Sequence, residues 1–144
     1  MDERYEFSAD RARVDRALVH RWLSEQSYWA QGRTREKQDA AIDGSWPYGV
    51  YEREGGRQVG FARVVTDGAT FAWLADVFVD PDVRGRGVGV ALVEGVLADL
   101  EPRGLRRVVL ATADAHTLYK RFGFTSLVDP ERWMVRGAPV DRAR

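Results

Sequence analysis

The chain has 144 residues, with 22 basic and 22 acidic side chains and no cysteine. This length suits one domain, residues 1–144, and the zero net charge supplies no overall field to recruit nucleic acid or an anionic membrane. The lack of cysteine excludes disulfides, thiolate metal ligands and a cysteine nucleophile.

The first third of the chain predicts a short strand at residues 5–8 and two helices, at 12–24 and 34–42. Its N-terminus is charged and no apolar stretch approaches about 18 residues, so we expect a cytoplasmic protein without a membrane span. Two aromatic residues, Tyr28 and Trp29, lie in the loop between the helices. They either cap the core or form a wall of a ligand pocket.

The middle of the chain predicts an antiparallel meander of three strands, at residues 47–52, 58–65 and 71–79. The third strand is apolar on both faces, which is typical of a central strand. Asp76 is the one carboxylate inside it, and an unpaired charge there would cost several kcal/mol or raise its pKa. Asp76 is therefore either paired, for example with Arg63, or part of a functional site.

A glycine-rich turn follows this strand directly. Gly85, Gly87 and Gly89 remove three Cβ atoms at the point where a helix begins. The first N–H groups of a helix have no carbonyl partner and meet the positive end of the helix dipole, so they bind phosphate well. Arg84 and Arg86 add positive charge. The turn is predicted to bind a diphosphate.

Two familiar phosphate loops do not fit this turn. A P-loop requires Gly-Lys-Ser/Thr, but Lys37 and Lys120 are the only lysines and neither follows a glycine loop. The dinucleotide-binding fingerprint requires Gly-x-Gly-x-x-Gly, and Val90 occupies the place of its third glycine.

The last third of the chain predicts helices that alternate with further strands. A helix with an apolar stripe ends near residue 102, and a buried strand at 107–111 is predicted to run parallel to the strand at 71–79. A short helix at 115–123 then leads to a strand that begins at Phe124. The sheet is therefore mixed, with helices on its faces.

Two motifs resemble those of the GNAT superfamily of acyl-CoA-dependent N-acyltransferases. Residues 84–89 read Arg-x-x-Gly-x-Gly, like the pyrophosphate loop of that family, and residues 115–124 read Ala-x-x-Leu-Tyr-x-x-x-Gly-Phe, like the helix beside the cofactor thiol. The resemblance implies an α+β fold, an α/β/α sandwich with a mixed, mostly antiparallel sheet of six to seven strands and helices on both faces. It also implies acetyl-CoA as cofactor.

The resemblance assigns roles to Tyr119 and to the cofactor-binding residues, while the base candidates are chosen by their positions in the chain. Tyr119 would donate a proton or hydrogen bond to the departing thiolate, and Asp76 is the candidate base. His116 shares the helical face of Tyr119 and is a second base candidate, while Thr112 stands where the family often has asparagine. The implied cofactor-binding residues are Phe78, Val79, Arg84, Gly85, Arg86, Gly87, Val88, Gly89, Thr112 and His116.

The acceptor is expected to be an amine on a small molecule or a peptide, because aromatic rings and a carboxylate suit a small cation. We expect no metal, since the two histidines are far apart in the sequence, and a monomer or homodimer. A non-catalytic acyl-CoA sensor and a plain nucleotide-binding fold are the alternatives. The predicted acceptor-binding residues are Tyr28, Trp29, Ser45, Trp46, Arg63 and Asp76.

Overall fold

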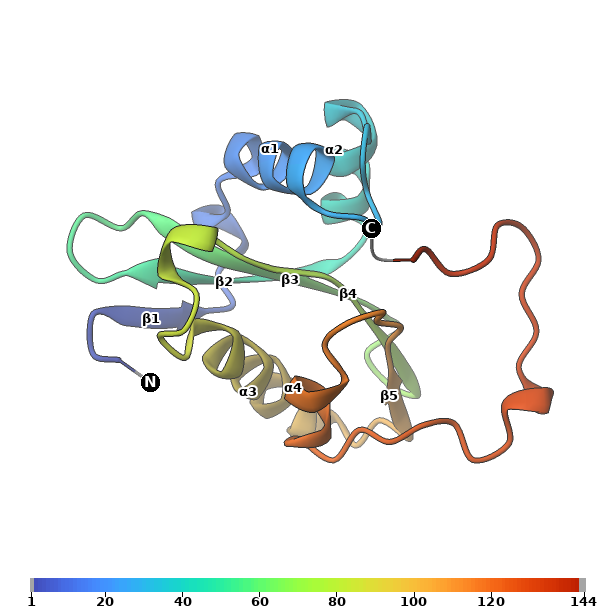
Figure 1. The fold of residues 1–144 in the computed structure, drawn as a ribbon. Coiled ribbons are helices and arrows are strands. Elements are labelled where there is room, and N and C mark those ends of the chain that lie inside the picture. Colours follow the sequence, from blue (N-terminus) through green and yellow to red (C-terminus); the bar gives the residue numbers. More distant parts are fainter. Residues whose placement is uncertain (1, 143–144) are drawn as a thin grey trace.

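A five-stranded sheet with the order β1-β2-β3-β4-β5 forms the middle layer of the molecule (Figure 1). The computed structural model describes residues 2–142, so the extreme ends of the predicted domain 1–144 lie outside it. The first four strands are antiparallel and β5 is parallel to β4, which confirms the mixed sheet. The strands are β1 (Tyr5–Ser8), β2 (Trp46–Glu52), β3 (Gln58–Thr66), β4 (Phe71–Val79) and β5 (Arg107–Val109).

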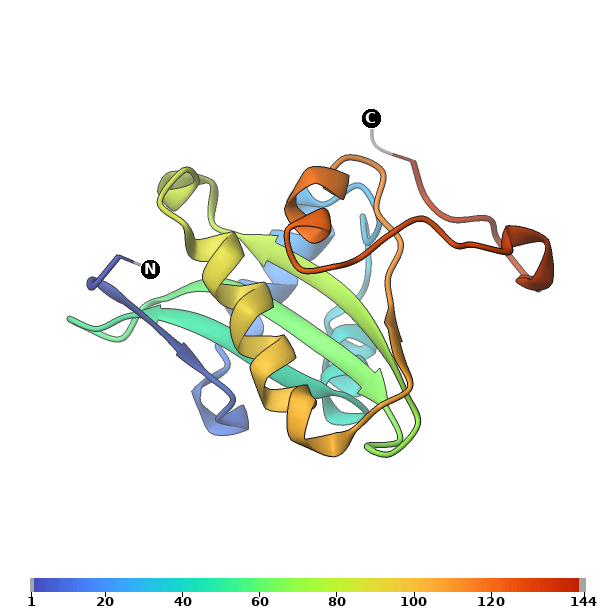
Figure 2. The same cartoon turned by 90° about the horizontal axis from the view of Figure 1, so that it is seen from below.

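The expected count of six to seven strands is corrected to five among residues 2–142. β5 ends at Val109 rather than at residue 111, and its side chains are partly exposed rather than buried. Phe124 does not begin a strand. Gly123 adopts a φ of 87°. The chain beyond Gly123 turns away from the edge of the sheet (Figure 2), so the backbone that follows Phe124 has no neighbouring strand to pair with.

Helices cover both faces of the sheet, as expected (Figure 1). One face carries α1 (Arg16–Gln26) and α2 (Arg35–Asp43), and the other carries α3 (Val88–Leu100) and α4 (His116–Lys120). The first helix begins later than the sequence pattern predicts, because residues 11–13 form a separate 3-10 turn. Within residues 2–142, no helix has the length and apolar character needed to cross a bilayer.

Further 3-10 turns lie between or after these elements, at Pro81–Val83, Glu101–Arg103 and Pro130–Arg132. The first of them joins β4 to the glycine turn, where the Asp80 carboxylate accepts a hydrogen bond from the Asp82 N–H. This side-chain cap fixes the direction in which the chain leaves β4.

Strand β1 braces helix α3. The ring of Phe7 lies over Gly95, and a Cβ at that glycine would overlap the ring. The hydroxyl of Tyr5 accepts a hydrogen bond from Arg86 Nη1 at 3.0 Å, just before the helix begins. Residues of β1 therefore contact both the middle of α3 and the turn at its N-terminus.

On the opposite face, α1 holds the far end of β4. The ring of Trp22 stacks on the ring of Phe78 with their centroids 5.4 Å apart, and both side chains are buried. Burying each large aromatic side chain stabilises the fold by roughly 1.5–3 kcal/mol. Strand β4 is thus packed against helices on both of its faces.

Candidate active site

A cleft opens between β4 and β5. The two parallel strands pair only where Phe71–Trp73 meets Arg107–Val109. Beyond that point they separate around a cavity of about 520 Å³, which is lined by residues 74–79 on one side and by residues such as Leu110 and Thr112 on the other. Strands that separate leave backbone donors and acceptors unpaired along the facing edges, so this cleft suits an extended polar ligand.

The glycine turn lies at the end of β4 and has the backbone that the sequence predicts. Gly85 and Gly87 have φ angles of 84° and 80°, the left-handed region that side chains disfavour. Gly87 is the N-cap of α3 and supplies no side-chain hydrogen bond, so the first N–H groups of this 13-residue helix have no partner from a capping side chain. No atom lies within 4 Å of a Cβ built on Gly85 or Gly87. The turn therefore leaves space in front of the first N–H groups of α3.

The third glycine of the turn has a different role. Gly89 has a helical backbone, and a Cβ there would lie 3.6 Å from Val79 Cγ2, an ordinary contact. Alanine would therefore fit at this position without a clash inside the protein. Its Cβ would matter only to a ligand that lies against the first turn of α3.

The two arginines of the turn fold back onto the body of the protein. Arg84 donates from Nε to the Val79 carbonyl at 3.2 Å, and its guanidinium lies 5.4 Å from the centre of the Phe78 ring. Arg86 donates to Tyr5. Both side chains fix the shape of the turn and keep two positive charges beside it, which favours an anionic ligand.

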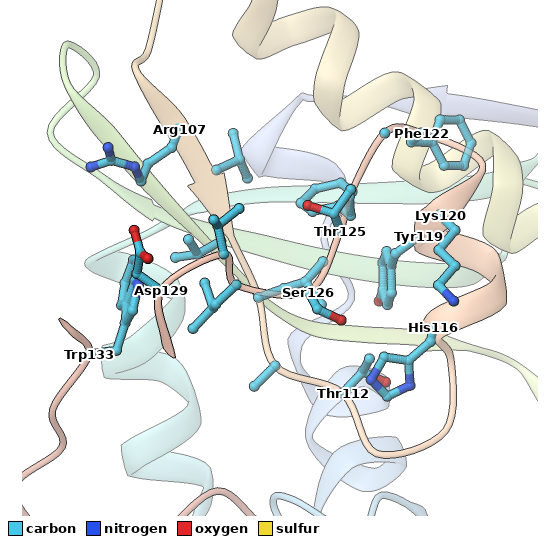
Figure 3. A pocket seen from close by; sticks show the side chains of 18 of the residues that line it. Arg107, Thr112, His116, Tyr119, Lys120, Phe122, Thr125, Ser126, Asp129 and Trp133 are labelled. Carbon is cyan, nitrogen blue, oxygen red and sulfur yellow. The ribbon is translucent and has the colours of Figure 1, made fainter. Parts of the chain in front are cut away.

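Tyr119 lies where the cleft meets a neighbouring cavity of about 1020 Å³ and lines both (Figure 3). The residue is only 7% exposed, and its ring packs edge-on against Phe124. Burial, with smaller contributions from the nearby Tyr28 and Asp114, raises the pKa of the phenol to about 12. Its O–H is therefore protonated at neutral pH and can donate.

Thr112 and Tyr28 shape the entry to α4. The Thr112 hydroxyl accepts from the Ala115 N–H at 3.1 Å, and the Tyr28 hydroxyl accepts from the Ala113 N–H at 2.9 Å. Both side chains also line the cleft. His116 is the first residue of α4 but is exposed and lines the larger cavity instead (Figure 3).

Asp76 is held by three donors in the wall of the cleft. Trp29 Nε1 donates to Oδ1 at 2.9 Å, and Arg33 Nη1 and Arg63 Nε both donate to Oδ2 at 2.7 Å. The pairing with Arg63, which the sequence left open, is present. Burial opposes ionisation of Asp76, but the charges of Arg63 and Arg33 outweigh it and lower the pKa of the carboxyl below its usual value.

A bulge in β4 directs this carboxylate. Asp76 has a φ of 55°, and the pairing of β4 with β3 shifts register beside it. Aspartate tolerates the left-handed region better than most side chains because its short polar group bonds locally. The extra residue therefore places Asp76 among the arginines rather than in the regular alternation of the strand.

The residues around Asp76 extend the network away from the cleft. Arg63 Nη1 donates to Ser45 Oγ at 3.0 Å, and Arg33 Nη1 also donates to Gln38 Oε1 at 2.9 Å. Gln38 is fully buried, and its Nε2 has no partner among residues 2–142. The sequence did not predict a role for Arg33 or Gln38. The one feature that could have indicated Arg33 is its position a few residues after the aromatic pair Tyr28 and Trp29.

The structure brings nine of the predicted site residues together around the cleft. Residues 85–89 of the glycine turn lie outside its lining, and so do three predicted residues elsewhere in the chain. Ser45 is buried and reaches the cleft only through Arg63, and His116 lies in the larger cavity. Trp46 lies elsewhere, with the Arg103 guanidinium 4.4 Å from its ring centre. The predicted residues that line the cleft are Tyr28, Trp29, Arg63, Asp76, Phe78, Val79, Arg84, Thr112 and Tyr119.

Comparison with known proteins then identifies the family. A profile of the Acetyltransferase (GNAT) family matches residues 16–124. The chain belongs to the GNAT family. A crystal structure from Xanthomonas campestris pv. campestris, assigned to the same family, has 46% identity and a TM-score of 0.87 and covers 94% of each chain. These matches confirm the family that the two motifs indicated.

More distant similarities cover part of the chain or the fold alone. Serotonin N-acetyltransferase 2 of Oryza sativa subsp. japonica is 37% identical over 90 residues, which cover 62% of this chain and 43% of that protein. The chain thus spans less than half the length of this relative. A Mycobacterium tuberculosis protein solved in complex with CoA has the same fold, with a TM-score of 0.71, 19% identity, and coverage of 85% of this chain and 72% of that one.

Proposed function

We propose that this GNAT protein transfers an acetyl group from acetyl-CoA to a primary amine of a small molecule or peptide, by direct attack in a ternary complex. One observation carries the proposal: the buried phenol of Tyr119 lines the same cleft as Arg84, the residue that directly precedes the glycine turn. The CoA bound to the Mycobacterium tuberculosis protein of the same fold supports a CoA-type cofactor.

The residues of the turn fit the diphosphate of this cofactor. The N–H groups at Gly85, Gly87 and the start of α3 would bind the phosphate oxygens, with Arg84 and Arg86 supplying charge. The exposed backbone edge of β4 near Phe78 and Val79 would bind the extended arm and stabilise the charge that develops on the acyl oxygen. The bound cofactor supplies the thioester; Tyr119 would donate to the sulfur as it departs.

Asp76 is better suited to positioning than to proton abstraction. An alkylammonium with a pKa near 10.4 is only about one part in 2,500 free amine at pH 7, so it must lose a proton before attack. A carboxylate whose pKa is lowered by two guanidinium groups is a weak base. We therefore infer that Asp76 orients Arg33 and Arg63, and that the amine proton leaves to water in the cleft.

The charges in the cleft indicate the class of acceptor. Arg33 and Arg63 carry two positive charges against the single negative charge of Asp76, and their Nη2 groups have no partner within residues 2–142. Guanidinium groups bind carboxylates with two parallel hydrogen bonds. We infer an amine that carries a carboxylate, which refines the small cation expected from the sequence.

A ligand and substrate panel tests both parts of the proposal. Acetyl-CoA is expected to raise the melting temperature more than ATP or NAD does, because only a ligand of the folded state stabilises it. Amines would then be tested in matched pairs, each amino acid against its decarboxylated analogue, by release of free thiol. The carboxylate-bearing member is expected to have a kcat/KM at least about tenfold higher, given the strength of a charged hydrogen bond.

Each contrary result has a separate meaning. If acetyl-CoA stabilises the protein but no amine releases free thiol, the protein is a sensor and the assignment as an enzyme is wrong. If ATP or NAD stabilises it equally, the assignment of acetyl-CoA as cofactor is wrong. If the decarboxylated amines are turned over faster, only the inferred class of acceptor is wrong.

A matched pair of glycine variants tests the turn. Gly85→Ala and Gly55→Ala each place a side chain at a positive φ, 84° and 85°, in open space. Both are expected to lower the free energy of unfolding by about 1–2 kcal/mol, the cost of the left-handed backbone. Only Gly85→Ala is expected to raise the Kd for acetyl-CoA, by about tenfold. Its Cβ would enter the open space beside the turn and hold the diphosphate away from a backbone N–H, and loss of one charge-assisted hydrogen bond is worth that much. Isothermal titration calorimetry would show it; equal Kd values for the two variants would contradict the assignment.

A further inference from the structure

Two exposed apolar side chains lie next to each other on the sheet. Val65 of β3 is 43% exposed and Trp73 of β4 is 38% exposed, and the two are partners in the antiparallel pairing of these strands. Among residues 2–142, every other exposed large hydrophobic side chain lies beyond residue 126. Because cross-strand partners point to the same face of a sheet, Val65 and Trp73 form one small apolar patch.

This patch adjoins the charged network of the cleft. Arg63 lies two residues before Val65 in β3, and alternate residues of a strand point to the same face. Arg63 shares the Asp76 carboxylate with Arg33, which comes from the loop between α1 and α2. Guanidinium groups and exposed apolar surface therefore occur side by side on the sheet face that α1 and α2 cover in part.

Of the two apolar residues, Trp73 lines the cleft and Val65 does not. Trp73 is opposite Val109 in the last pair of β4 and β5, at the point where these strands begin to separate. Its ring packs in neither apolar core, and its Nε1 has no hydrogen-bond partner within residues 2–142. Trp29 differs, because its Nε1 donates to Asp76. The ring of Trp73 is therefore available to a ligand in the cleft.

We propose that Trp73 forms a subsite for the side chain of the acceptor, and that the acceptor is a free α-amino acid with an aromatic or large aliphatic side chain. This inference rests on the proposed acetyl transfer. Arg33 and Arg63 would bind the carboxylate, the amine would reach the thioester beside Tyr119, and the side chain would lie against the indole of Trp73. Each of these four residues lines the cleft.

The size of the cleft favours an amine and a carboxylate that are close together. Its volume of about 520 Å³ must also hold the arm of the cofactor. Only a few bonds can therefore separate the two groups, as they do in an α-amino acid. A peptide N-terminus has an amide in place of that carboxylate, which would leave the charges of Arg33 and Arg63 without an anion.

The reaction that follows is balanced without another reactant. The amine nitrogen, after loss of a proton to water, forms a bond to the acetyl carbon while the carbon–sulfur bond breaks. The nitrogen then loses a second proton, and the departing sulfur gains one. The products are an N-acetyl amino acid and free CoA.

Kinetics with a matched pair of acceptors tests the subsite. For the wild type, kcat/KM for L-phenylalanine is expected to exceed that for L-alanine by at least about tenfold, because apolar pockets discriminate by such factors. Trp73→Ala should lower the value for L-phenylalanine by about tenfold and change that for L-alanine by less than about twofold. Trp73→Phe, which keeps an aromatic ring, should retain most of the preference.

Val65→Ala is the matched control. Val65 has a similar exposed fraction and is the strand partner of Trp73, but it lies outside the cleft lining. This variant should leave both kcat/KM values unchanged. Equal values for L-phenylalanine and L-alanine in the wild type would overturn the subsite, although acetyl transfer would stand. An equal loss with both acceptors in Trp73→Ala would also overturn it, because that result indicates a general structural role.

A binding measurement keeps the subsite testable if the proposed function fails. Should no amine release thiol, isothermal titration calorimetry with L-phenylalanine and L-alanine alone would still decide the matter. The wild type is expected to bind L-phenylalanine at least about tenfold more tightly than L-alanine, and Trp73→Ala should remove that difference. The same Kd for L-phenylalanine in the wild type and Trp73→Ala would overturn the subsite.

Discussion

Replacing Tyr119 by phenylalanine is expected to lower kcat for acetyl transfer by about 10²- to 10³-fold, the range for loss of a positioned proton donor. The Kd for acetyl-CoA should change less than about twofold, because in the proposed mechanism the phenol would donate to the sulfur only as the sulfur departs. Steady-state kinetics with the best amine of the panel, together with calorimetry, would measure both quantities.

Tyr51→Phe is the matched control for this variant. Burial raises the pKa of Tyr51 to about 12, as for Tyr119, but its hydroxyl is buried in β2 without a partner among residues 2–142. Removing it should leave kcat unchanged and should not destabilise the protein, because an unpaired buried hydroxyl costs free energy. Equal kcat values for wild type and Tyr119→Phe would remove Tyr119 from the mechanism.

The pH profile provides a second readout of the same residue. Because the pKa of Tyr119 is raised to about 12, the phenol remains protonated through pH 10. The value of kcat is therefore expected to rise with pH as the amine loses its proton, without a fall below pH 10. A decline centred near pH 10 would indicate an ordinary tyrosine that loses its proton in that range.

Replacing Asp76 by asparagine is expected to lower the free energy of unfolding by about 3–5 kcal/mol, the usual cost of removing one partner from a buried ion pair. Asparagine keeps the shape of the side chain and tolerates the left-handed backbone at this position, so the loss reports the charge rather than the bulge. Arg33 and Arg63 would be left without their negative partner. Urea denaturation would measure the change.

The control is a carboxylate with a similar contact at the surface. Asp43 lies 2.6 Å from Arg16 with its side chain 67% exposed, and Asp43→Asn should cost at most about 1 kcal/mol. A similarly small loss for Asp76→Asn would contradict the structural role of the network.

Acid sensitivity follows from the same carboxyl. The folded protein lowers the pKa of Asp76 below the unfolded value of about 3.9, so this stabilisation is fully present above that pH. It is lost as the pH falls through the lower, folded pKa. The wild type should therefore lose unfolding free energy more steeply than Asp76→Asn below about pH 4. A loss that begins well above pH 4 would indicate a raised pKa instead.

The sequence predicted those parts of the site whose cause is local. The glycine turn follows from three glycines at a helix start, and the antiparallel meander follows from apolar patterns between clear turns. The buried position of Asp76 also followed from the apolar residues on both sides of it. In each case the residues that determine the structure are close together in the chain.

The remainder depends on contacts between distant segments. Arg33 reaches Asp76 from a loop 43 residues earlier, and no spacing rule predicts that approach. Phe124 and Trp133 have strand-forming side chains, but a strand also requires a neighbour, and within residues 2–142 that neighbour is missing. The six to seven strands implied by the family resemblance therefore became five.

The brace that β1 provides to α3 links the start of the chain to its glycine turn. Tyr5 holds Arg86 at one end of the helix, and the ring of Phe7 fixes the spacing between Gly95 and the sheet. A substitution that displaces β1 would therefore tilt α3 as a whole. The affinity for the cofactor would then depend on the packing of β1, although no residue of this edge strand lines the cleft.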